Sequence, residues 1–161
     1  MVWKPHVTVA AVVERQGRFL VVEEKVRGER VLNNPAGHLE PAESLLDAVK
    51  RETLEETGWE FEPEAVVGIY LWQHPELQDT FLRVAFSGHC LRHHADRPLD
   101  KGIVGPQWLT RQELGDGTRA LRSPLVLRCI DDYLSGLRYP LQILSHLDDL
   151  WVSGAAAEVS R

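Results

Sequence analysis

Apolar and polar positions along the chain follow two different periods. Short, continuous apolar runs rich in β-branched residues are typical of buried strands, whereas apolar positions three and four apart are typical of helices. The predicted strands are residues 6–13, 18–24, 66–73, 80–91 and 106–109. The first two are joined by a short turn at residues 15–17, which predicts a hairpin. Residues 31–39 are expected to be extended, because Pro35 and Gly37 disfavour a helix there.

Two segments have the helical period. Residues 40–57 have apolar side chains at helical spacing and charged ones on the other side. Pro41 is suited to the first helical position and Gly58 to the position just after the last turn. A second helix is expected over residues 124–134, with Ser123 as its N-cap. About six strands and two long helices indicate a mixed α/β domain.

The chain shows no linker and no internal repeat, so we predict one domain over residues 3–140. Residues 141–161 form a C-terminal extension, and its last residues are expected to be disordered because they lack periodicity. The apolar faces of both helices can be covered within one subunit, which favours a monomer.

Composition excludes several classes of protein. A net charge of −6 argues against binding to nucleic acid polymers, and no apolar run is long enough to span a membrane. The apolar stretch near the N-terminus is interrupted by Glu14-Arg15 and is interpreted as a strand, not a signal peptide. The two cysteines, Cys90 and Cys129, suit reduced thiols in a cytoplasmic protein better than a disulfide.

The candidate chemistry lies on the first predicted helix. Glu52, Glu55 and Glu56 stand at i, i+3 and i+4, so their carboxylates share one face. Like charges so placed repel by about 0.2–0.5 kcal/mol per pair. A hard divalent cation such as Mg²⁺ reverses that sign, because it prefers oxygen ligands and shares its coordination sphere with phosphates. Arg51 can pair with Glu55 one turn on and with Glu43 two turns back, which would orient the cluster.

Gly37 precedes this helix, so its backbone can approach a ligand closely and its carbonyl offers a further oxygen. A face rich in Glu and Arg is most often plain solvent-exposed surface, and E-x-x-E-E alone is a weak signal. The complete spacing G-x5-E-x7-R-E-x2-E-E-x-G, which runs from Gly37 to Gly58, has seven fixed identities and is far more specific.

Residues 37–59 resemble the Nudix box, G-x5-E-x7-R-E-U-x-E-E-x-G-U, in which U is a bulky apolar residue. All seven fixed letters are present, and Trp59 satisfies the second U. Thr53 replaces the first U; it should face the core, where its hydroxyl can bond a backbone carbonyl one turn back. The segments KPHVTVAAVV, FLVVEE, NNPAGHLE, LRSPLV and SGLRYPL also resemble the NudJ-type phosphatases of that family, over about residues 3–140.

The resemblance implies an α/β/α sandwich with a mixed sheet, in which the box forms a loop–helix–loop. It implies Mg²⁺-dependent attack of water on small phosphorylated substrates, with Mn²⁺ as a substitute cation. For the NudJ-type members it implies release of orthophosphate from nucleoside tri- and diphosphates and from the pyrimidine diphosphate precursor of thiamine. An oxidised-purine or dinucleotide pyrophosphohydrolase, or a non-hydrolytic nucleotide sensor, is the alternative.

The resemblance also assigns residues. Glu52 and Glu56 are expected to ligate the metal directly. Glu55 would do so through water or to a second ion, and Gly37 through its carbonyl. Glu43 and Arg51 are expected to form the orienting ion pair.

The general base is expected to be Glu52 or Glu55, with Asp100 as the alternative. His6, Arg83 and Asp100 are further candidates, for contact with the substrate.

Overall fold

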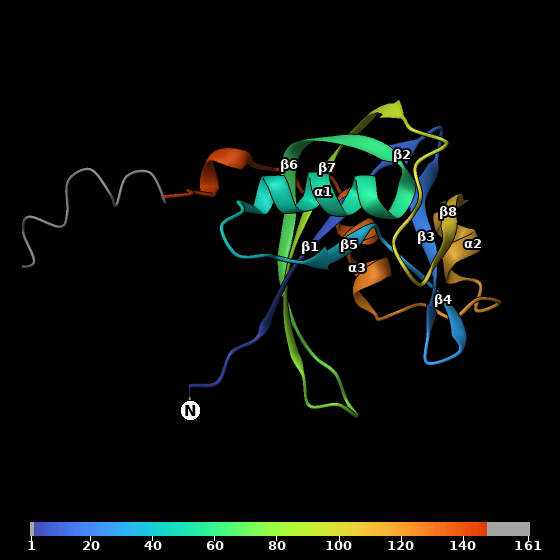
Figure 1. Ribbon diagram of the computed structural model, residues 1–161, viewed down its shortest axis with the longest axis horizontal. Helices are drawn as coiled ribbons and strands as arrows, with labels where there is room; N and C mark the ends of the chain where they lie inside the picture. The colour runs from blue at the N-terminus through green and yellow to red at the C-terminus, as the bar shows by residue number, and fades with distance from the viewer. Residues whose placement is uncertain (1, 148–161) are drawn as a thin grey trace, which may run out of the picture.

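The computed structural model describes residues 2–147, which form two β-sheets and the helices that cover them (Figure 1). The larger sheet has the strand order β5-β1-β7-β6-β9. Its strands are β5 (Ala36–His38), β1 (His6–Val12), β7 (Thr80–His93), β6 (Trp59–Gln73) and β9 (Tyr139–Pro140). Strand β1 pairs with β7 in parallel, and the other pairs are antiparallel, so the sheet is mixed as predicted.

The smaller sheet is organised around β3 (Arg18–Val26), which pairs with the other three strands. These are β2 (Glu14–Arg15), β4 (Glu29–Asn33) and β8 (Ile103–Thr110). The helices are α1 (Leu45–Thr57), α2 (Arg111–Gly115), α3 (Leu125–Leu134) and the short 3₁₀ helix η1 (Leu141–Ile143).

Helices cover both faces of the larger sheet. Because side chains alternate along β1, Val9 and Ala11 face one side and Ala10 the other. The first side packs against Ala48 and Val49 of α1, and the second against α3. Figure 1 shows α1 lying across the strands of this sheet. This arrangement is the predicted α/β/α sandwich.

The first helix begins later than predicted. It starts at Leu45 with Ser44 as N-cap, whose side chain accepts a hydrogen bond from the backbone N–H three residues on. Pro41 is therefore not at the first helical position, because Ala42 has a φ of 63° and cannot continue a right-handed helix. The predicted end is confirmed: Gly58 adopts a φ of 73° and its N–H donates to the Leu54 carbonyl.

The other boundaries differ by a few residues. Helix α3 begins at Leu125 with Pro124 as N-cap, so the predicted N-cap Ser123 lies one residue earlier and its hydroxyl accepts from the Leu125 N–H. Strand β6 begins seven residues before the predicted 66, because register shifts accommodate its polar first half. The short elements α2 and β9 were not predicted.

Three further sequence predictions concern the C-terminus, membrane spans and the cysteines. The predicted disorder of the last residues concerns positions 148–161, which lie outside the described part of the chain. Within residues 2–147 no helix is both long and apolar enough to cross a membrane. In the same range Cys90 and Cys129 are free thiols, as predicted.

Candidate active site

The site is built where α1 lies against β5, the end strand of the larger sheet. Strand β5 pairs only with β1, so the backbone groups on its outer edge need other partners. The Ala36 N–H donates to Oε2 of Glu56 at 3.0 Å, and Nη2 of Arg51 donates to the His38 carbonyl at 3.0 Å. Two side chains of the box helix therefore bind one N–H group and one carbonyl on the free edge of the strand and fix the helix against it.

Gly37 lies between these two contacts and directly under Glu52. A Cβ atom at residue 37 would come within 2.0–2.3 Å of the Glu52 carboxylate atoms. The glycine is required because the carboxylate fills the space that a side chain would take. The sequence predicted that a ligand can approach the backbone of Gly37 closely. In the structure the group that lies against Gly37 is the carboxylate of Glu52.

The carbonyl of Gly37 is directed by the β1–β5 ladder. Hydrogen bonds from Ala11 N–H to Pro35 O and from Leu39 N–H to Val7 O flank the pairing of Val9 with Gly37. Alternation along an antiparallel ladder therefore directs the Gly37 carbonyl toward β1, which leaves one of its two lone pairs for a ligand.

Arg51 organises the acidic side chains. Its guanidinium contacts Glu43 at 2.7 Å, Glu52 at 2.8 Å and Glu55 at 3.1 Å, and Glu40 lies 3.7 Å away. The hydrogen bond from Arg51 is the main reason that the pKa of the Glu43 carboxyl is lowered from its usual value. The predicted pairing of Arg51 with Glu43 and Glu55 is confirmed, and it extends to Glu52.

Acidic groups converge beside Arg51. Single carboxylate oxygens of Glu52, Glu55 and Asp100 all lie within 4.8 Å of one another. The backbone N–H of Asp100 donates to the Glu55 carbonyl at 3.1 Å, which fixes the loop before β8 against the end of α1. Asp100 is thus placed with the box carboxylates, although it is 45 residues or more away in sequence.

Burial makes two of the carboxyls on α1, those of Glu52 and Glu56, reluctant to ionise. Burial raises the pKa of Glu52 from its usual value and raises that of Glu56 to about 9, and their mutual repulsion adds to the rise at Glu56. The site therefore concentrates hard oxygen donors that repel one another when ionised. Such a donor set fits a hard divalent cation, whose charge would compensate both effects.

Thr53, which replaces an apolar residue of the box, is accommodated as predicted. Its side chain is completely buried, and its hydroxyl donates to the Val49 carbonyl one turn back at 2.7 Å. The hydroxyl is satisfied locally, so the substitution leaves no unpaired polar atom in the core.

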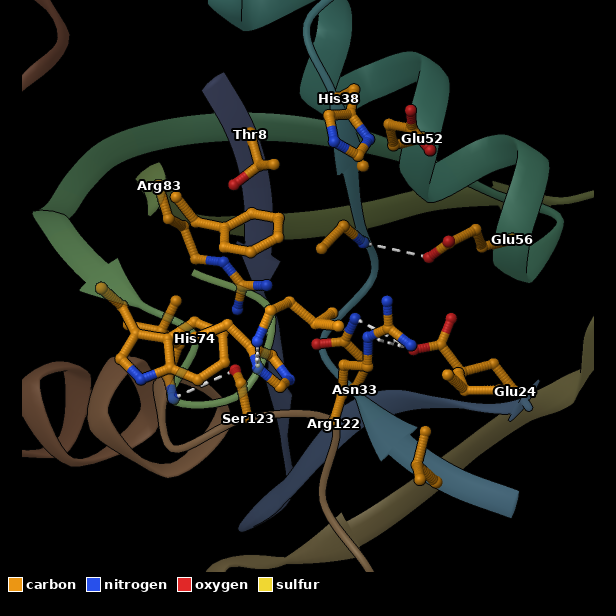
Figure 2. A pocket seen from close by; sticks show the side chains of 18 of the residues that line it. Thr8, Glu24, Asn33, His38, Glu52, Glu56, His74, Arg83, Arg122 and Ser123 are labelled. Carbon is orange, nitrogen blue, oxygen red and sulfur yellow. Dashed lines mark hydrogen bonds and ion pairs between the residues drawn. The ribbon is translucent and has the colours of Figure 1, made fainter. Parts of the chain in front are cut away.

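A cavity of about 650 Å³ opens beside the carboxylates (Figure 2). The floor of the cavity is formed by the face of the larger sheet on which α3 packs. Helix α3 covers the alanines of this face, and the cavity lies beside them. Cross-strand pairing places His38, Thr8 and Arg83 in one row across this floor. Two residues further along the strands, Phe81 and Trp72 form an aromatic row that also lines the cavity. The cavity thus has an acidic side, a cationic centre and an aromatic side.

The three sequence candidates for substrate contact, His6, Arg83 and Asp100, lie in different places. Arg83 lines the cavity and is 6% exposed. His6 lies at the margin, stacked on Phe81 with ring centroids 5.1 Å apart and with Nε2 3.7 Å from Asp79. Asp100 lies with Glu52 and Glu55 and does not line the cavity.

Sequence reasoning missed several residues that line the cavity: Thr8, Glu24, Asn33, Phe81 and Arg122. Thr8 carried a usable signal, because it is the one polar residue in the apolar run of β1. The others carried none. They lie on separate strands and loops, and only strand pairing brings them together.

Comparison with known proteins identifies the family. The NUDIX domain model matches residues 4–128, most of the chain. The chain therefore belongs to the Nudix family, and it is a phosphohydrolase that acts on phosphoanhydrides.

Individual proteins of known sequence or structure resemble the chain to different degrees. The chain is 42% identical over 142 residues to Phosphatase NudJ of Escherichia coli strain K12, covering 88% of this chain and 92% of that protein. A solved NUDIX hydrolase from Nitrosomonas europaea is 49% identical, with a TM-score of 0.87 over 89% of this chain and 97% of that chain. A UDP-X diphosphatase structure is 18% identical with a TM-score of 0.69, covering 87% of this chain and 68% of that one. The last likeness shows the fold alone.

Proposed function

We propose that this protein uses Mg²⁺ to hydrolyse phosphoanhydride bonds in nucleoside tri- and diphosphates and in the pyrimidine diphosphate precursor of thiamine, releasing orthophosphate. The observation that carries the metal dependence is the convergence of Glu52, Glu55 and Asp100 within 4.8 Å beside the cavity. The likeness to a protein named Phosphatase NudJ supports orthophosphate as the product.

The metal would be held by Glu52 and Glu56 directly and by the Gly37 carbonyl, with Glu55 contributing through water or to a second ion and Mn²⁺ as a substitute ion. When bound there, the cation neutralises the phosphates and lowers the pKa of a water ligand. Arg51 holds Glu52 and Glu55 in position, and Glu43 in turn holds Arg51.

Glu55 is the proposed general base, with Glu52 and Asp100 as the alternatives. Its carboxylate is the more exposed of the two beside Arg51, so a proton taken from water can leave to solvent. Glu55 removes a proton from the attacking water while the water oxygen bonds to the terminal phosphorus. The bridging oxygen then leaves with the shortened phosphate chain, and orthophosphate is released.

The remaining expectations concern the cellular context. We propose that the substrates are small phosphorylated molecules, that the protein is monomeric and that it resides in the cytoplasm. Two free cysteines agree with a reducing compartment. The net charge of −6 disfavours association with nucleic acid polymers.

The test is a substrate panel in which orthophosphate and pyrophosphate are measured separately, with and without Mg²⁺. Glu56→Gln should reduce turnover by about 10²-fold or more, beyond the 10–100-fold effects of residues that only support metal ligands. Glu64→Gln is the matched control, because Glu64 is exposed and pairs with His89 outside the site.

Other outcomes would reassign the activity. Pyrophosphate as the sole product would favour an oxidised-purine or dinucleotide pyrophosphohydrolase. Nucleotide binding without any product would favour a sensor. Near-normal turnover of Glu56→Gln, or full activity without divalent cations, would overturn the proposed role of the carboxylates.

A further inference from the structure

Arg83 is a buried cation without an acidic partner. It is 6% exposed, and its guanidinium donates from Nη1 to Oδ1 of Asn34 at 3.4 Å. Within residues 2–147 it forms no ion pair with a carboxylate, and its Nε atom has no hydrogen-bond partner. Leaving a charge buried and unpaired costs several kcal/mol in typical proteins, so such a side chain is rarely kept for stability.

The thiol of Cys129 beside Arg83 does not compensate this charge. Burial raises the pKa of the Cys129 thiol, so the sulfur stays neutral at physiological pH. Burial also lowers the pKa of Arg83, but an arginine remains protonated over the range in which proteins work. The guanidinium therefore presents a full positive charge to the cavity.

The cavity that Arg83 faces is also lined by other residues with unsatisfied polar atoms. Across the described residues, the buried side-chain atoms without a partner are Thr8 Oγ1, Asn33 Oδ1 and Arg83 Nε. All three residues line the same cavity. Thr8 and Arg83 are direct cross-strand neighbours in the β1–β7 pair, so a hydroxyl and a guanidinium face the cavity together. Figure 2 shows the Arg83 guanidinium pointing toward the middle of the cavity.

The position of these donors relative to the carboxylates matters. Thr8 pairs with His38 on its other side, and His38 lies on β5 next to Gly37 and Glu52. Strand β1 therefore lies between Arg83 on β7 and the edge strand β5, against which the acidic side chains of α1 are held. A ligand held by Arg83 and, through a cation, by the carboxylates must itself carry more than one anionic group.

We propose that Arg83, together with Thr8, forms an anion subsite that binds a phosphoryl group of the substrate while the rest of the polyphosphate reaches the acidic site. This inference rests on the proposed function and restricts its substrates to molecules with at least two linked phosphates. Arg83 binds the phosphoryl group through the planar fork of its guanidinium, and Thr8 donates its hydroxyl.

The experiment measures binding of inorganic pyrophosphate to the metal-free protein in EDTA by NMR titration. The wild-type protein should bind, and Arg83→Met should weaken binding by about tenfold or more, as expected for loss of a charge-assisted bidentate contact. Arg83→Lys keeps the charge without the fork and should fall between them. Arg92→Met, on the same strand but exposed and outside the cavity, is the matched control.

Thermal unfolding separates binding from a structural role. Arg83→Met removes an unpaired buried charge, so its melting temperature should equal or exceed that of the wild-type protein. Unchanged pyrophosphate binding by Arg83→Met, no binding by the wild-type protein, or a lower melting temperature with binding intact would each overturn the proposal. Glu56→Gln should lose hydrolysis but keep pyrophosphate binding, so the subsite and the proposed function can fail independently.

Discussion

The carboxylate of Glu52 occupies the space in which a side chain of residue 37 would lie. An ideal Cβ on Gly37 would be 2.0–2.3 Å from the Glu52 carboxylate atoms, which is far inside van der Waals contact. The box helix and the end strand of the sheet therefore leave no room for a side chain at residue 37 while Glu52 keeps this conformation. Gly37 and Glu52, the first glycine and the second glutamate of the motif, therefore pack directly against each other.

Gly37→Ala should inactivate the protein without unfolding it. The backbone at Gly37 does not need a positive φ, and the atoms that the new methyl group meets are the far end of a flexible side chain. Glu52 would turn away, and we expect phosphate release to fall by about 10–100-fold, as when the support of a metal ligand is lost. The melting temperature should change little.

The matched control for this substitution is Gly105→Ala. Gly105 lies in β8, has no atom within 4 Å of the position that a methyl group would take, and likewise needs no positive φ. It should retain full activity. If Gly37→Ala were as active as Gly105→Ala, the close contact with Glu52 would have no functional meaning.

The metal-free protein should lose stability as the pH rises from about 5 to about 9. Glu56 has a pKa of about 9 in the folded protein against an ordinary value of 4.5, so across this range the unfolded chain gives up a proton that the folded protein keeps. Ionisation then favours the unfolded state, by about 1.4 kcal/mol for each unit of pKa difference at most.

Chemical denaturation in EDTA at several pH values measures this slope. Glu56→Gln stays neutral at every pH and can still accept from the Ala36 N–H, so its stability should vary less with pH. Burial also raises the pKa of Glu52, so a smaller slope of the same sign should remain in this variant. Equal slopes for the two proteins would show that Glu56 is ionised in the metal-free fold.

Arg51→Met should affect both stability and activity, because it leaves Glu43, Glu52 and Glu55 without their shared cation. We expect turnover to fall by about 10–100-fold and the free energy of unfolding by roughly 1–3 kcal/mol. Steady-state kinetics and denaturant unfolding measure the two effects.

Arg111→Met is the comparison for Arg51. Arg111 pairs with Asp131 on the surface and does not line the cavity, and surface pairs contribute about 1 kcal/mol or less. Its activity should be unchanged. An Arg51→Met protein that behaved like this control would contradict the organising role of Arg51.

Thr53→Val should be nearly silent. The hydroxyl of Thr53 bonds only to the Val49 carbonyl, and an isosteric methyl group leaves no donor unpaired. The hydroxyl of Thr57, four residues later, makes two hydrogen bonds: it donates to the Thr53 carbonyl and accepts from the Trp59 N–H. Thr57→Val should cost roughly 1–2 kcal/mol in unfolding experiments, whereas Thr53→Val should cost less than ~0.5 kcal/mol. A large loss of activity in Thr53→Val would assign its hydroxyl a role that its contacts do not show.

Local signals predicted the elements better than their boundaries. The end of α1 was correct because Gly58 supplies the left-handed conformation that stops a helix. Its start was wrong because Pro41 and Ser44 are both favourable near a helix N-terminus, and the sequence does not say which one the chain uses. In the folded protein the left-handed backbone at Ala42 and the contact of Glu43 with Arg51 make Ser44 the N-cap of the helix.

The sequence by itself determined that Glu52, Glu55 and Glu56 share one side of a helix with Arg51. Helical period depends on backbone hydrogen bonds four residues apart, so spacing in the chain fixes spacing in space. Only the tertiary structure decided that Asp100 joins these carboxylates and that Arg83 faces the cavity beside Thr8. Those neighbours are set by strand register and by packing between distant segments, which depend on the whole core and not on any local pattern.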